Sequence, residues 1–174
     1  TNCQSHADGT LADEEYHWLT KRADGGFGLV MTCAAHVQAA GQGFPGQLGT
    51  FDDKHIPGLE RLAKGIRERG AVSSVQLHHA GDRSPADLIG GPARAPYDDE
   101  EKQVKALSTG EVEQVVADFA AAAARCEKAG FDGIELHGAH GYLLCEFLRT
   151  RNDRTDGWGG DYAGRTRIYR EVIA

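Results

Sequence analysis

Residues 108–137 read STGEVEQVVADFAAAAARCEKAGFDGIELH and contain one helix followed by one strand. Ser108 and Glu111 have the spacing of a capping box, which satisfies the first free N–H groups of a helix. Apolar residues then recur at helical spacing over Val112–Ala123, and a glycine ends the helix. The apolar run Phe131–His137 has the length of a buried strand. These residues therefore predict a helix that leads directly into a strand.

The same order of helix, glycine and strand occurs twice before residue 108. The pattern predicts further helices over 13–24, 53–69 and 160–174, and further strands over 27–33 and 72–78. Residues 34–50 are rich in glycine, and residues 80–107 are polar with three prolines, so both segments are expected to be loops. Helices that alternate with buried strands indicate crossover units on a parallel sheet.

Two fold classes satisfy this alternation, an open doubly wound sheet and a closed eight-stranded barrel. A dinucleotide-binding sheet would carry a glycine-rich turn that joins its first strand directly to a helix. Neither that junction nor a phosphate loop of the form G-x-x-x-x-G-K-[ST] is present. The barrel is therefore the favoured fold class.

The composition is that of an ordinary globular domain and excludes several classes of partner. The 174 residues include 26 acidic and 19 basic side chains, a formal net charge of −7, so binding to nucleic acid is not expected. An apolar run of about 18 residues, the length that a membrane span needs, is missing, so membrane insertion is not expected either. The four cysteines are widely scattered, which predicts reduced thiols in a cytoplasmic protein.

Polar side chains gather where two of the predicted strands end. Four of the eight histidines lie there with a glutamine and a tyrosine: Gln76, His78, His79, His137, His140 and Tyr142. In a parallel barrel the active site forms at the carboxyl ends of the strands, so these six residues are candidates for a functional site.

The spacing of His137 and His140 leaves three interpretations open. The two imidazoles are a metal pair, or they are satisfied by backbone carbonyls, or they donate hydrogen bonds to an oxygen of a substrate. A zinc site needs at least a third protein ligand, which the pair alone does not supply. Taken alone, a tyrosine such as Tyr142 is more often a packing residue than a catalytic one, and Gln76 is compatible with capping of a neighbouring strand.

Three longer segments together are more specific than any of these signals. They are VQLHHAGDR at 75–83, FDGIELHGAHGYLLCEFL at 131–148 and NDRTDGWGG at 152–160. In order, spacing and sequence they resemble the old yellow enzyme family, the FMN-dependent NAD(P)H oxidoreductases that are also called ene-reductases. The resemblance extends over essentially the whole chain.

The resemblance implies a partial TIM (β/α)8 barrel. Residues 1–174 would form one partial domain with strands two to four and their helices, while the first strand and strands five to eight would lie outside it. We therefore expect either that these residues are part of a longer protein or that a completing chain, such as a second copy in a homo-oligomer, closes the barrel, because three strands alone would leave the barrel interior uncovered.

The resemblance also assigns a cofactor site. FMN would lie at the carboxyl-end mouth of the barrel, with NAD(P)H as hydride donor. Gln76 would bind the pyrimidine edge of the flavin, Ala34 would offer a backbone contact, and the hydroxyl of Thr1 would lie near the flavin C4 oxygen.

The catalytic residues implied by the resemblance are His137, His140 and Tyr142. The two histidines would bind the carbonyl oxygen of a small activated alkene, where negative charge develops during reduction. Tyr142 would donate the proton, since a phenol is protonated at neutral pH. No metal ligand is implied.

Two other readings remain at this point. One is a metal-dependent barrel lyase or hydrolase that uses His78, His79, His137 and His140. The other is a truncated domain without catalytic activity.

Overall fold

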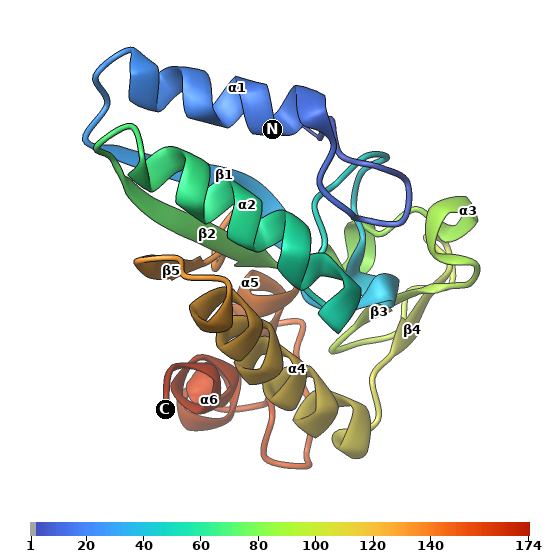
Figure 1. Cartoon of the computed structure of the whole chain (residues 1–174). Coiled ribbons are helices and arrows are strands. Elements are labelled where there is room, and N and C mark those ends of the chain that lie inside the picture. The colour runs from blue at the N-terminus through green and yellow to red at the C-terminus, as the bar shows by residue number, and fades with distance from the viewer. Residues whose placement is uncertain (1–2) are drawn as a thin grey trace.

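The computed structural model describes residues 3–174 and contains a three-stranded parallel sheet. Its strands lie in the order β1 (Leu29–His36), β2 (Val72–His78) and β5 (Gly133–Leu136). The helices α1 (Asp13–Asp24), α2 (Ile56–Arg67) and α4 (Thr109–Lys128) lie side by side on one face of this sheet (Figure 1). The three predicted helix–strand units are thereby confirmed.

The capping box at the start of α4 forms as its sequence predicts. The Ser108 hydroxyl accepts a hydrogen bond from the Glu111 N–H, and the Glu111 carboxylate accepts one from the Ser108 N–H. Val112, Val115 and Phe119 then face the core and are almost fully buried. Burial of one such side chain stabilises the fold by about 1.5–3 kcal/mol, which fixes α4 against α2 and β2.

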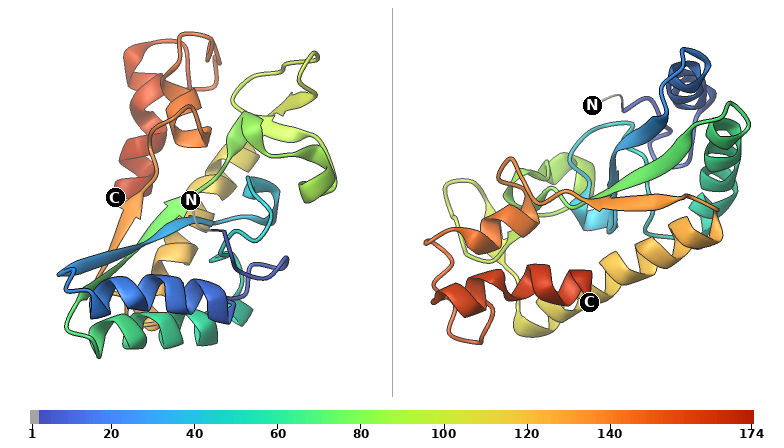
Figure 2. Two further views of the ribbon diagram at one scale, coloured as in Figure 1. Left: turned by 90° about the horizontal axis from the view of Figure 1, so that it is seen from above. Right: turned by 90° about the vertical axis from the view of Figure 1, so that its left-hand side faces the viewer.

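No helix among the described residues covers the opposite face of the sheet, and this one-sided cover distinguishes a barrel from a doubly wound sheet. The second view in Figure 2 shows the helices along one side of the three strands. Large apolar side chains are exposed at both margins: Phe27 is 64% and Leu29 55% exposed beside β1, and Ile134 is 46% exposed on β5. The architecture is that of a partial TIM barrel.

The first strand differs from its prediction. It begins two residues later than expected and continues to His36, because Ala34, Ala35 and His36 pair with the end of β2. A bulge interrupts the pairing between Met31 and Ala34. The Thr32 hydroxyl fills it by accepting a hydrogen bond of 3.2 Å from the backbone N–H of Gln76.

The segment 80–107 is not the plain loop that was expected. It contains four short elements: η3 (Gly81–Arg83), α3 (Ala86–Ile89), β3 (Ala93–Ala95) and β4 (Val104–Ala106). β3 and β4 pair with each other as a second parallel sheet. This subdomain lies beyond the carboxyl ends of β1 and β2, where β3 contacts η3 and η1 (Ala39–Gly41).

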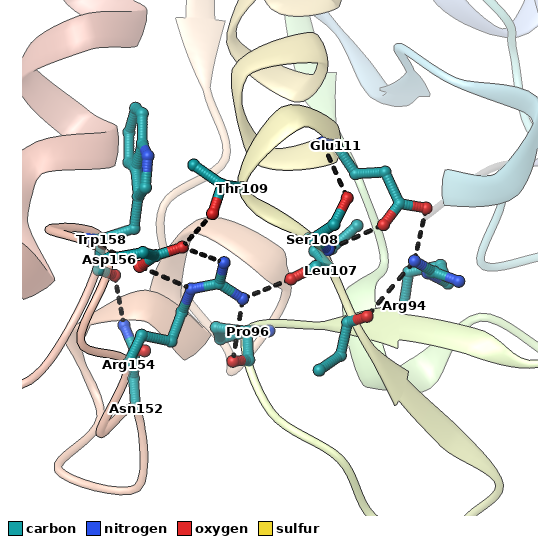
Figure 3. Close-up of polar contacts among 11 residues, drawn as sticks. Arg94, Pro96, Leu107, Ser108, Thr109, Glu111, Asn152, Arg154, Asp156 and Trp158 are labelled. Carbon is teal, nitrogen blue, oxygen red and sulfur yellow. Dashed lines mark hydrogen bonds and ion pairs between the residues drawn. The ribbon is translucent and has the colours of Figure 1, made fainter.

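An arginine ties this subdomain to the rest of the fold. Figure 3 shows the Arg154 guanidinium donating to the carbonyls of Pro96 and Leu107 and pairing with Asp156. The Asp156 carboxylate also accepts a hydrogen bond of 2.7 Å from the Thr109 hydroxyl at the start of α4. The segment 152–160 therefore holds the subdomain of residues 80–107 next to the start of α4.

The remaining elements complete the chain. They are η2 (Asp53–His55), α5 (Leu143–Leu148), which the sequence did not predict, and α6 (Tyr162–Ile173), which it did. The four cysteines are free, as expected. Over residues 3–174, none of the helices combines the length and the apolarity that a membrane crossing requires.

Candidate active site

A cavity of about 520 Å³ runs along β1 and reaches the carboxyl ends of the other two strands. Five of the six residues that the resemblance assigns to the cofactor and catalytic sites line it: Ala34, Gln76, His137, His140 and Tyr142. The sixth, Thr1, lies outside the described residues. The structure thus brings all five of the predicted residues that lie within 3–174 to one cavity.

The bulge in β1 places the two predicted cofactor contacts next to each other. Because of it, Ala34 lies opposite Gln76, and Gln76 lies opposite Glu135 on β5, so the three residues form one row across the sheet. The Gln76 side-chain N–H₂ donates to the Glu135 carboxylate. An amide has a second N–H and an acceptor oxygen, so Gln76 retains both functions for a ligand.

A sharp reversal of the chain after β5 brings together the other three residues. His140 and Gly141 both have left-handed backbone conformations, with φ of 58° and 73°. His140 Nδ1 lies 3.4 Å from His137 Nε2, and the Tyr142 ring centroid lies 5.0 Å from that of His137. A left-handed conformation costs a residue other than glycine roughly 1–2 kcal/mol, a strain that clusters at functional sites.

The electrostatic surroundings favour a neutral His137 imidazole at this reversal. Partial burial lowers the pKa of His137, and the nearby His140 lowers it further. None of the described residues that line the cavity is an aspartate or glutamate. The arrangement can therefore donate hydrogen bonds to a ligand oxygen without repelling negative charge on it.

The other two histidines are placed differently from what a metal site would need. His79 is buried, its Nε2 lies 3.0 Å from the Gln38 side-chain oxygen, and its Nδ1 accepts from the Gly81 N–H. Burial lowers the pKa of His78 and of His79 to about 3. Within residues 3–174, no three His, Cys, Asp or Glu side chains form a group that could hold a metal ion. The geometry gives the metal-dependent reading no support.

Sequence reasoning missed two side chains beside Tyr142. The Arg83 guanidinium lies 5.4 Å from the centroid of the Tyr142 ring, and the Phe44 ring meets the same ring edge-on at 6.5 Å. Both residues lie in segments expected to be loops, where no periodicity signals which side chains turn inward. Of the two residues, only Arg83 lies within one of the three segments that resemble the old yellow enzyme family, VQLHHAGDR at 75–83.

A family comparison decides the chain's relationship. The model of the NADH:flavin oxidoreductase / NADH oxidase family matches residues 1–174. The chain belongs to this family. Its members are flavin-dependent oxidoreductases, so the expected relationship to old yellow enzymes is confirmed.

Curated relatives of the family agree. A probable NADH-dependent flavin oxidoreductase, YqiG of Bacillus subtilis, is 40% identical over 166 residues, which are 92% of this chain and 44% of the relative. An NADPH dehydrogenase of Listeria monocytogenes is 38% identical over 169 residues, 95% of this chain and 50% of the relative. The chain thus spans about half the length of the curated relatives it matches.

Solved structures of family members show the same fold. Old Yellow Enzyme from Pichia sp. AKU4542 superposes with a TM-score of 0.91 at 29% identity, covering 99% of this chain and 49% of that chain. A 2-naphthoyl-CoA reductase complex superposes with a TM-score of 0.94 at 29% identity, covering 99% of this chain and 29% of that chain.

Proposed function

We propose that this chain forms part of the active site of an FMN-dependent oxidoreductase that reduces small activated alkenes with NAD(P)H. The observation that carries the proposal is the convergence of His137, His140 and Tyr142 on the cavity that also contains Gln76. The membership of the chain in a flavin-dependent family supports it.

The donor set beside β1 fits a flavin. Gln76 offers both a donor and an acceptor to the pyrimidine edge, and the backbone of Ala34 lies beside it in the sheet. The role proposed for Thr1 rests on the resemblance alone. When bound, the flavin supplies hydride transfer between the nicotinamide and the alkene, while the protein orients and polarises the reactants.

His137 and His140 would polarise the alkene through its carbonyl oxygen. Negative charge grows on that oxygen as the alkene is reduced, and two N–H donors fixed at one place stabilise the charge where it develops. Their nearest ring nitrogens lie 3.4 Å apart, so a small acceptor that replaces this contact would be within reach of both side chains. A carboxylate at this position would repel the enolate.

Tyr142 would donate the proton to the α carbon. The Tyr142→Phe variant of the full-length protein is expected to reduce a test enone, 2-cyclohexenone, about a hundredfold more slowly, because general acid catalysis contributes at least that much. Reduction of the flavin by NAD(P)H should change less than about threefold. Stopped-flow absorbance of the flavin measures the two half-reactions separately.

The exposed Tyr162 provides the matched control, since it lies on α6, is not among the residues that line the cavity and is 77% exposed. Tyr162→Phe should leave both half-reactions unchanged. An equal loss in both half-reactions for Tyr142→Phe would contradict the proton-donor role.

Completion of the barrel is part of the proposal. The apolar side chains exposed beside β1 and on β5 would be covered by the neighbouring strands and helices of a closed barrel. The isolated 174-residue chain is therefore expected to bind little FMN and to reduce no alkene. Flavin titration and size-exclusion chromatography of that chain test this, and a monomer that is both yellow and active would contradict it.

A further inference from the structure

Gln47 connects the two sides of the candidate active site. It lies in the loop that follows β1 and is fully buried. Its side-chain nitrogen donates to the Ala34 carbonyl at 2.9 Å and contacts Nδ1 of His78 at 3.0 Å, while its oxygen accepts from the Gly43 N–H at 2.8 Å. A single amide therefore holds the end of β1, its own loop and the end of β2.

These contacts determine the tautomer of His78. A backbone carbonyl can only accept and a backbone N–H can only donate, so Ala34 and Gly43 together fix which end of the Gln47 amide is nitrogen. That nitrogen can only donate, so Nδ1 of His78 must be the acceptor. The proton of the neutral His78 ring then resides on Nε2.

His78 in turn supports the residues proposed to act on the alkene. Its ring is fully buried, with its centroid 4.4 Å from that of Tyr142 and 5.2 Å from that of His137. The Tyr142 ring meets it nearly at a right angle, with an interplanar angle of 80°. A rotation of the His78 ring would therefore move both neighbours or leave a gap beneath them.

We propose that Gln47 is a positioning residue for alkene reduction: it fixes the orientation and tautomer of His78, and the His78 ring fixes the Tyr142 proton donor. The same amide also holds the backbone of Ala34, which is proposed to contact the flavin. One side chain would therefore fix the position of the proton donor relative to the flavin. This inference rests on the proposed function. Gln47 itself lies outside the cavity lining.

A double-mutant cycle in the full-length, flavin-loaded protein separates positioning from general stabilisation. Gln47→Leu is expected to lower the limiting rate of 2-cyclohexenone reduction about ten- to thirtyfold, with the apparent Kd for the enone and the reductive half-reaction within about threefold. When Tyr142→Phe is already present, Gln47→Leu should cost less than about threefold more, because the two changes act through one group.

Gln42 gives a matched control. It is a buried glutamine in the same loop, and its side chain donates to the Phe44 carbonyl at 3.2 Å, within that loop. Gln42→Leu should leave the limiting rate within about threefold of the wild type. Equal effects of Gln42→Leu and Gln47→Leu, or fully additive effects of Gln47→Leu and Tyr142→Phe, would overturn the inference.

A second variant provides a readout that does not depend on activity or on the leucine variant folding. Gln47→Glu keeps the shape and the acceptor for Gly43, but its carboxylate can no longer donate to His78 or to the Ala34 carbonyl. The His78 proton should then move from Nε2 to Nδ1, and the two ring-nitrogen shifts in the ¹⁵N NMR spectrum of histidine-labelled protein should exchange. Retention of the Nε2–H tautomer would contradict the inference.

The two proposals fail in different ways. A full-length wild-type protein that binds no flavin or reduces no enone refutes the proposed function, and the positioning role falls with it. A wild-type protein that reduces enones while the cycle is additive or the tautomer stays unchanged refutes the role of Gln47 alone.

Discussion

Two pairs of histidines follow neighbouring strands, and their surroundings differ sharply. His78 and His79 at the end of β2 are buried, and each has a hydrogen-bond partner from the chain. His137 and His140, after β5, line the cavity, and the contact of 3.4 Å joins their rings to each other. The residue type is the same in both pairs, and burial and partners decide what each pair can do.

The comparison divides the four histidines into two groups with different surroundings. Burial holds His78 and His79 neutral, and three of their four ring nitrogens contact Gln47, Gln38 or Gly81. The His78 ring packs against Tyr142 and His137. Of the two pairs, His137 and His140 line the cavity.

Removal of the cavity-lining pair should have the largest effect on catalysis. In the full-length protein, the double variant His137→Leu/His140→Leu is expected to lower the rate of enone reduction about a hundred- to a thousandfold, as loss of oxyanion donors does. Flavin reduction by NAD(P)H should stay within about threefold. Single-turnover kinetics measure both, and His17→Leu on the exposed face of α1 is the control.

Removal of a buried histidine should instead affect stability. His79→Ala leaves a cavity and strips partners from Gln38 and the Gly81 N–H, so the free energy of unfolding should fall by about 2–4 kcal/mol. His140→Ala should change it by no more than about 0.5 kcal/mol, because this side chain is exposed. Urea denaturation of the two variants tests the difference, and equal losses would remove the distinction between the pairs.

A decrease in pH should gradually lower the unfolding free energy through the buried pair, His78 and His79. The pKa of His78 and of His79 is about 3 in the folded protein against the usual 6.5, so below pH 6.5 the unfolded chain takes up protons that the folded chain does not. The contribution of these two histidines to stability is therefore complete above pH 6.5 and falls as the pH decreases, by about 1.4 kcal/mol per pH unit for each histidine.

The slope of unfolding free energy against pH, between about pH 7 and pH 4, measures this effect. His79→Gln should remove one histidine's share of the slope, whereas His140→Gln should leave the slope unchanged. A slope that is the same in all three proteins would show that the buried histidines titrate normally.

The local parts of this fold could be predicted from the sequence. The capping box of α4 and the strand Val72–His78 depend on neighbouring residues, and both occur as expected. The bulge between Met31 and Ala34 could not be predicted, because it depends on pairing with a strand some 40 residues away. The three-residue strands β3 and β4 depend on each other in the same way, and α5 is too short to show a helical period.

The candidate site was predictable only in part for a related reason. Gln76, His137, His140 and Tyr142 belong to extended motifs, so the resemblance identified them, and the structure brings them to one cavity. Gln47 and Phe44 lie in a glycine-rich loop without periodicity. Their contacts with His78 and Tyr142 exist only once the loop is folded against the strand ends.

Anaerobic reoxidation of the flavin by an enone tests the central claim most directly. The full-length protein, reduced with one equivalent of NADPH, is mixed with 2-cyclohexenone while the visible flavin band is followed. We expect the band to return fully in the wild type and to remain bleached on the same timescale in His137→Leu/His140→Leu. Equal reoxidation of the two proteins would contradict the assignment of this histidine pair to the alkene.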